Sequence, residues 1–142
     1  MFEENIATSQ RLLTEAFGAG NLDLVDEFCS DDFVGHDPLL GDTDRAASKQ
    51  SIADYRAAFP DLSFTVDDIF AADDKVVYRW TGQGTFKNPL MGIEPTGESG
   101  DPVSGITIDR YEDGKIVESW THWDALGLMR NMGVVGEGAA TA

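Results

Sequence analysis

Apolar residues follow a helical spacing in the first part of the chain and an alternating spacing after it. In the first part they recur every three or four residues, as on one face of an amphipathic helix. Three helices are predicted. The first spans Glu3–Phe17, the second begins at Asn21 and includes Phe28, and the third begins near Asp44 and ends before Pro60. Between the last two helices, the sequence DDFVGHDPLLGD predicts a loop with one short strand at Phe33–Val34.

The alternating part predicts two hairpins. The predicted strands span 63–71 and 75–86, joined by AADDK, and 103–111 and 115–124, joined by EDG. A short helix, ALGLMRNMG, follows, and residues 136–142 form a frayed tail. Helices in a run followed by strands in a run are typical of an α+β domain. We therefore expect one domain over residues 1–135, in which an antiparallel sheet of about four to six strands packs against helices.

Charge narrows the range of partners. The chain has 26 acidic and ten basic residues, and its net charge of −16 repels nucleic acid and anionic lipid. We therefore expect neither a nucleic acid nor a membrane as a partner. The acidic residues are spread evenly, which is typical of proteins from a salt-rich cytoplasm and predicts a halophilic origin. The sequence has no signal-peptide pattern and no membrane-length apolar run, so we expect a cytoplasmic location.

Metal chemistry receives little support from the sequence. Cys29 is the single cysteine, so neither an intramolecular disulfide framework nor a cysteine metal cluster is expected. His36, His122 and Asp124 do not have the spacing of metal ligands. We predict no metal site.

The second hairpin can form with either of two turns. A two-residue Asp113–Gly114 turn separates the isoleucines of one strand from those of the other. A three-residue turn over 112–114 pairs Tyr111 with Lys115 and gathers four apolar residues on one face. These four residues are Ile106, Ile108, Ile116 and Trp120. We predict the three-residue turn, with this apolar face turned inward.

The predicted inward face also carries ionisable residues from both strands. They are Arg110, Glu118, His122 and Asp124. Charged groups on an apolar face need partners, so these residues are expected to meet one another, a helix or a ligand. An apolar setting beside Trp120 would raise the pKa of Asp124, which suits proton transfer near neutral pH. Asp124 also precedes the last helix, and it can act as the N-cap of that helix instead.

The other candidate residues have both a binding and a structural interpretation. Arg110 can bind a carbonyl or anionic group or pair with Glu118, and His122 can orient Asp124 or serve as a hydrogen-bonded structural residue. His36 is expected at the rim of a pocket. Four residues are predicted either as core residues or as lining of that pocket: Tyr55, Phe59, Trp80 and Met129.

Several motifs together resemble the SnoaL-like polyketide cyclase (ester cyclase) family, within the nuclear transport factor 2-like superfamily. They are AFPDLSFTVDDIFAADDKVVYRWTGQGTF, MGIEPTG and DGKIVESWTHWDALGLMRNMG, with FVGHDP after the second helix. The likeness extends from about Phe28 to Gly133. It is specific for the family and much less specific for one reaction, because one fold hosts many chemistries.

The resemblance implies a cone-shaped barrel, in which a curved antiparallel sheet wraps around helices and leaves a pocket at the open end. It also implies a homodimer or higher oligomer and chemistry without a metal or an organic cofactor. Asp124 matches the general acid/base of the characterised cyclases. Arg110 stands where those cyclases have a histidine, and Phe86 stands where relatives often have another.

Three hypotheses of function follow. In the first, the chain is a cofactor-independent cyclase or isomerase for a small apolar carbonyl compound. Asp124 shuttles the proton, Arg110 or His122 polarises an oxygen, and Trp120 packs on the ligand. In the second, the same pocket only binds a hydrophobic metabolite. In the third, the domain is structural, and Tyr111 and Trp123 form a subunit interface on the outer face.

Overall fold

The computed structural model describes residues 2–95 and 100–134 and has the predicted α+β class. The predicted tail over 136–142 lies outside these residues. The helices are α1 (Phe2–Arg11), the π-helix η1 (Leu12–Phe17), α2 (Asp23–Phe28), α3 (Arg45–Ala58) and α4 (Ala125–Asn131). The strands are β1 (Cys29–Asp37), β2 (Gly41–Thr43), β3 (Ser63–Ala72), β4 (Lys75–Gln83), β5 (Val103–Glu112) and β6 (Lys115–Trp123). None of the described helices is long and apolar enough to span a membrane.

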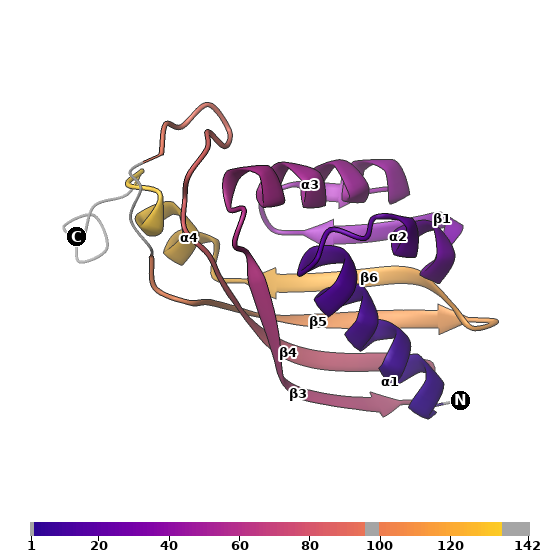
Figure 1. The fold of residues 1–142 in the computed structure, drawn as a ribbon. Helices are drawn as coiled ribbons and strands as arrows, with labels where there is room; N and C mark the ends of the chain where they lie inside the picture. The colour runs from indigo at the N-terminus through magenta and orange to yellow at the C-terminus, as the bar shows by residue number, and fades with distance from the viewer. Residues whose placement is uncertain (1, 96–99, 135–142) are drawn as a thin grey trace.

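The six strands form one curved sheet in the order β2-β1-β6-β5-β4-β3 (Figure 1). The helices α1, α2 and α3 lie on one face of this sheet, which we call the inner face. The prediction of a curved sheet wrapped around N-terminal helices is therefore confirmed. One pairing differs, since β1 runs parallel to β6 while the other neighbouring strands are antiparallel.

The start of α3 and the winding of η1 both depend on local structure. Asp44 accepts a hydrogen bond from the amide of Ala47 and so forms the N-cap of α3. The first predicted helix is interrupted, because its second half from Leu12 to Phe17 is wound as a π-helix. A π-helical turn is a feature often found at functional sites. It turns Leu12, Leu13 and Ala16 into the core.

The turn predicted for the second hairpin is wrong. Asp113 and Gly114, both with positive φ, form a two-residue turn that pairs Glu112 with Lys115. The register then shifts between Arg110 and Tyr111, because Val117 is an additional residue on β6. A bulge of this kind exchanges the two faces of a strand. Beyond the bulge, Arg110 is paired with Glu118 and Ile108 with Trp120.

The inward face predicted for β5 and β6 is also wrong, for two reasons. The two-residue turn pairs Tyr111, not Arg110, with Ile116 and so turns Arg110 and the isoleucines of β5 outward, and the bulge at Val117 does the same to the later residues of β6. Ile116 points inward as predicted. Simple alternation would place Glu118 and Trp120 on the same face as Ile116, but beyond the bulge they point outward and Ser119 points inward. Ile106 is 48% exposed, whereas Asp109 on the same strand is 1% exposed. The residues that line the inner face are Gly105, Thr107, Asp109, Tyr111, Ile116, Ser119, Thr121 and Trp123. Tyr111 and Trp123 therefore do not lie on the outer face.

Candidate functional site

A cavity of about 220 Å³ lies between the inner face of the sheet and the helices. It is larger than the roughly 150 Å³ engineered cavity that binds benzene, so a ring-sized molecule fits. Its wall is mostly apolar, with a few polar groups that converge on it, as in small-molecule sites. Eight of the lining residues are aromatic: Phe17, Phe33, Tyr55, Phe59, Phe64, Tyr78, Trp80 and Trp123.

Asp109 is the most deeply buried ionisable residue of the cavity wall. Its Oδ2 atom lies 2.7 Å from the hydroxyl of Ser9 on α1, and the Ser119 hydroxyl donates to Oδ1 over 2.5 Å. Burial raises the pKa of Asp109, although hydrogen bonds from Ser119, Ser9 and Tyr78 act in the opposite direction. A carboxyl group in this environment favours its protonated form more than an exposed aspartate does.

Ser9 extends this contact toward the N-terminal helix. Its hydroxyl lies 2.7 Å from the hydroxyl of Tyr111, which donates to the backbone carbonyl of Asn5 over 2.9 Å. Burial and the neighbouring Asp109 raise the pKa of Tyr111, so its hydroxyl keeps its proton. A continuous series of hydrogen-bond contacts therefore joins Asp109 in the cavity wall to α1.

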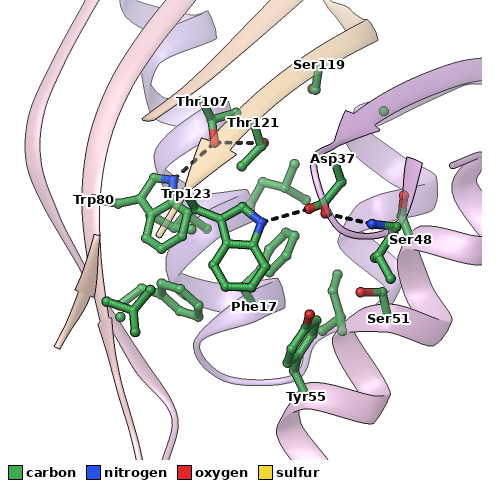
Figure 2. Close-up of a pocket in the computed structure, with 18 of the residues that line it drawn as sticks. Phe17, Asp37, Ser48, Ser51, Tyr55, Trp80, Thr107, Ser119, Thr121 and Trp123 are labelled. Carbon is green, nitrogen blue, oxygen red and sulfur yellow. Dashed lines mark hydrogen bonds between the residues drawn. The ribbon is translucent and has the colours of Figure 1, made fainter. Parts of the chain in front are cut away.

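A second polar cluster on the wall involves two threonines. The indole of Trp80 donates to Thr107 over 3.1 Å, and the hydroxyl of Thr107 lies 3.0 Å from that of Thr121. Figure 2 shows these three side chains on one side of the pocket. The cluster orients the Trp80 ring and satisfies its buried indole N–H, which would otherwise be costly.

Asp37 and Trp123 form a third polar contact. The Trp123 indole donates to Asp37 Oδ2 over 3.1 Å, and the amides of Leu39 and Leu40 donate to Asp37 Oδ1. The Tyr55 ring meets that of Trp123 edge-on, with 6.3 Å between centroids. Burial, followed by the charges of Asp37 and Asp54, raises the pKa of Tyr55 to about 12. Three N–H donors thus fix the orientation of Asp37 beside two aromatic rings (Figure 2).

The structure brings some predicted binding residues to the cavity and leaves others outside it. Tyr55, Phe59 and Trp80 line the cavity, and His36 borders it, although the His36 ring lies on the outer face beside Glu118. Trp120 lies on the outer face of the sheet, where its ring stacks on His36, and neither it nor Met129 is among the lining residues. The sequence therefore identified four residues of the cavity wall, while their roles in binding stay predictions.

The three residues predicted to be catalytic do not line the cavity. Asp124 is exposed and accepts a hydrogen bond from the Gly127 amide over 2.8 Å, which makes it the N-cap of α4. His122 lies on the outer face because of the bulge at Val117, and Arg110 lies there because the two-residue turn pairs Tyr111, not Arg110, with the inward-facing Ile116. The prediction that these three residues share an inward-facing pocket wall is wrong.

Arg110 belongs to an ionic network on the outer face. Its guanidinium donates to Glu118 Oε1 over 3.1 Å, and Glu118 Oε2 lies 2.7 Å from His36 Nε2. The other ring nitrogen of His36 lies 2.8 Å from Asp42. Hydrogen bonds to Glu118 and Asp42 raise the pKa of His36, and the bond from His36 lowers the pKa of Glu118. Of the two interpretations of Arg110, the pairing with Glu118 is confirmed, and the two residues lie directly opposite each other across the strands.

The polar residues of the cavity wall are not predicted from the sequence. Asp37, Asp109, Ser119, Thr107 and Thr121 resemble ordinary solvent-facing residues in an alternating strand. One signal for them is the two-residue Asp–Gly turn, a strong hairpin signal, which brings Ile108 and Trp120 to the same face only if a bulge follows it. Among the described residues, no three His, Cys, Asp or Glu side chains come together as a potential metal site.

Comparison with known proteins shows the family. The family model described as SnoaL-like polyketide cyclase matches residues 7–132, so the chain belongs to the SnoaL-like polyketide cyclase family. The predicted resemblance is confirmed. A comparison with curated proteins finds no match.

Solved structures of other proteins have the same fold. AclR of Streptomyces galilaeus, a candidate hydroxylase, is 26% identical with a TM-score of 0.85, covering 96% of this chain and 89% of that one. IdmH of Streptomyces antibioticus, a candidate polyketide cyclase, is 31% identical with a TM-score of 0.79, covering 92% and 99%. A candidate SnoaL-like cyclase from Jannaschia sp. is 22% identical with a TM-score of 0.84, covering 95% of each chain. The chain is a small-molecule pocket protein of the cyclase type.

Proposed function

We propose that the protein is a cofactor-independent cyclase or isomerase that performs acid/base chemistry on a small, largely apolar carbonyl compound. The observation that carries this proposal is a fully buried carboxyl group, Asp109, in the wall of an apolar cavity. Asp109 takes the role predicted for Asp124, because burial raises its pKa toward the range useful for proton transfer.

The chain of contacts behind Asp109 indicates its resting protonation state. Three contacts join Asp109, Ser9, Tyr111 and the Asn5 carbonyl. Three hydrogen bonds need three protons, and the two hydroxyl groups supply one each, while the carbonyl supplies none. When Ser9 donates to Asp109 and Tyr111 donates to the Asn5 carbonyl, no proton is left for the contact between Ser9 and Tyr111. A proton on Asp109, donated to Ser9, would free the Ser9 proton for Tyr111 and complete all three bonds, which supports a neutral resting Asp109.

In the proposed reaction, this proton moves to the carbonyl oxygen of the ligand. Ser119 and Tyr78 both line the cavity and hydrogen-bond to Asp109, so their hydroxyls can relay it. The resulting Asp109 carboxylate accepts the proton from the α-carbon, which leaves an enol and restores the acid. The enol can then attack a second carbonyl, as in ring closure, or take up a proton at another carbon, as in isomerisation.

Exchange of α-protons in a simple model ketone tests the reaction class even while the natural substrate is unidentified. 2-Tetralone is a ring-sized ketone, and its α-protons should exchange with D₂O faster with the protein than without it, as followed by NMR. Tetralin, which lacks the carbonyl, should compete for the cavity and slow the exchange. Binding of 2-tetralone without faster exchange would contradict catalysis.

A second candidate is a binding module that holds a hydrophobic metabolite without converting it. One observation favours it: among the described residues, no buried side-chain nitrogen or oxygen lacks a hydrogen-bond partner. Such a wall can bind an apolar molecule without rearrangement. The same NMR experiment separates the two candidates, since a binding module gives ligand shifts in the protein spectrum and no exchange.

The pH dependence of stability gives an independent prediction for Asp109. Its pKa is raised in the folded protein, while an unfolded aspartate has a pKa of about 3.9. Above that pH the unfolded chain binds fewer protons than the folded one, so the stability contributed at Asp109 falls as pH rises, until the folded pKa is passed.

The measurement is a set of urea unfolding curves for the wild type and Asp109→Asn at constant salt, from about pH 4 upward. The wild type should lose unfolding free energy relative to the variant as the pH rises. The other carboxyl groups are common to both proteins, so their effects cancel in the difference. Parallel curves, or a relative gain by the wild type, would show that Asp109 is ionised in the folded protein.

We also propose that the protein forms the homodimer expected from the sequence. The exposed apolar residues on the outer face of the sheet support this proposal. Cross-strand pairing places Phe70 beside Val77, Val77 beside Ile108, and Ile108 beside Trp120. Phe70 is 53% exposed. An apolar row across four strands is unusual for a face in contact with water and is typical of an interface. We propose that a second copy of the chain covers it.

Ile108→Glu tests this interface. The variant should be monomeric in sedimentation or light-scattering measurements at high salt, where the repulsion between two chains of net charge −16 is screened. Gln50→Glu on α3 adds the same charge away from the sheet, and it should leave the dimer intact. The proposal fails if the wild type is a monomer or if Ile108→Glu keeps the dimer.

A further inference from the structure

The cavity has an unusual balance of charge. Asp37, Asp101 and Asp109 line it, while none of its described lining residues is a lysine or an arginine. His36 is the one basic lining residue, and its two ring nitrogens already bond to the carboxylates of Asp42 and Glu118. The His36 ring is therefore engaged by its own partners and does not compensate the aspartates of the wall.

Asp37 is the carboxylate whose charge is available to a ligand. Its three hydrogen-bond donors, two backbone amides and the Trp123 indole, are all neutral. None of the ion pairs found in the described part of the chain includes Asp37. The donors thus fix the position of the carboxylate without neutralising it.

Two aromatic rings lie beside this carboxylate. The rings of Trp123 and Tyr55 meet edge-on beside Asp37, and Trp80 lies across the same pocket (Figure 2). Aromatic faces attract cations, and aromatic cages are the usual binding sites for quaternary ammonium groups. A carboxylate in a partly buried apolar setting strengthens this attraction, because the local dielectric constant is lower than that of water.

The charge of the whole protein acts in the same direction. A net charge of −16 attracts cations and repels carboxylates and phosphates before they reach the cavity. Neutral ligands are unaffected by this field. The charge of the cavity wall and the net charge of the protein therefore both favour a positively charged ligand.

We propose that the cavity takes a cationic ligand, in which a protonated or quaternary amine on an apolar ring lies between the Asp37 carboxylate and the rings of Tyr55 and Trp123. This inference rests on the proposed small-molecule function of the same cavity and specifies its ligand as an amine-bearing compound. It also predicts that substrates attached to phosphate-containing carriers are excluded.

Three probes that share a phenyl ring test the proposal, and two of them have the same shape. Phenyltrimethylammonium and tert-butylbenzene differ at one atom, which is a positively charged nitrogen in the first and a neutral carbon in the second. Benzoate carries a negative charge on the same ring. Titrations are followed through the indole N–H signals of Trp80 and Trp123. The cation should bind about tenfold more tightly than the neutral isostere, within the range of cation–π and charge contributions. Benzoate should bind more weakly than both.

Two variants with the same change in charge locate the effect. Asp37→Asn keeps an oxygen that can accept from Trp123, and it should reduce the preference for the cation to less than about threefold. Asp113→Asn removes a charge in the β5–β6 turn, where a positive φ suits asparagine, and it should keep the full preference.

The outcomes separate this inference from the proposed function. Equal or tighter binding of tert-butylbenzene, or of benzoate, overturns the cationic ligand and leaves the small-molecule cavity in place. An undiminished preference in Asp37→Asn overturns the assignment to Asp37. If none of the three probes perturbs Trp80 or Trp123, both the inference and the proposed function are contradicted.

Discussion

Asp109→Asn should abolish the exchange of α-protons in 2-tetralone while the protein stays folded and still binds the ketone. Loss of a positioned acid/base group reduces a rate by about 10²–10⁴-fold. The fold should tolerate the change, because asparagine resembles the neutral acid in size and in hydrogen bonding. Its oxygen can accept from Ser119 as the carboxyl oxygen does, and its amide NH₂ can donate to the Ser9 hydroxyl, as the neutral acid proposed above would.

Asp124→Asn is the matched control for this experiment. Asparagine is as good an N-cap as aspartate, so the hydrogen bond from Gly127 is kept and α4 stays stable. The exchange rate should equal that of the wild type. The opposite pattern, with exchange lost in Asp124→Asn and kept in Asp109→Asn, would return the catalytic role to the residue predicted from the sequence.

Gly105→Ala should both destabilise the protein and weaken ligand binding. Gly105 pairs with Trp80 on one side and Trp123 on the other. A Cβ atom at this position would collide with Cζ2 of Trp80 and lie 2.7 Å from Cβ of Trp123. Overpacking of this kind costs about 1–3 kcal/mol, which exceeds the roughly 0.5–1 kcal/mol that alanine gains over glycine in a strand.

The effect on binding follows from the displaced rings. Trp80 and Trp123 both line the cavity, so moving them changes its shape as well as the free energy of unfolding. Calorimetric titration with 2-tetralone and chemical denaturation measure the two effects. Gly114→Ala, at a positive-φ position in the β5–β6 turn with no neighbour within 4 Å, should lose stability through backbone strain and keep the ligand affinity. Native stability and affinity in Gly105→Ala would contradict this account of the wall.

The fold could be predicted from the sequence where its signals are local. Asp44 caps α3, as an aspartate before a helix is expected to do. The hairpin predicted over 63–86 forms from Ser63 to Gln83, with one register shift between Val66 and Asp68. The parallel pairing of β1 with β6 depends on residues some 80 positions apart, such as His36 and Trp120, and no local pattern reports such contacts. For this reason the sequence predicts a much shorter strand than β1.

The site is predicted less well, and the β5–β6 turn and Val117 together explain most of the difference. The two-residue turn places Ile106 and Ile108 on the outer face of β5, and the additional residue on β6 turns Trp120 and His122 outward. The isoleucines of β5, predicted as inward-facing, form an outer apolar row instead. The polar residues of the alternation point into the cavity. In a domain that encloses a ligand cavity, the inward face of a strand therefore need not be its most apolar face.

A crystal structure of the protein with 2-tetralone tests the central claim most directly. We predict ligand density in the inner-face cavity among Tyr55, Trp80 and Trp123, with the ketone oxygen within hydrogen-bond distance of the Ser119 or Tyr78 hydroxyl. Density on the outer face near Arg110 and His122, or beside Asp124, would contradict the claim that the inner-face cavity is the functional site.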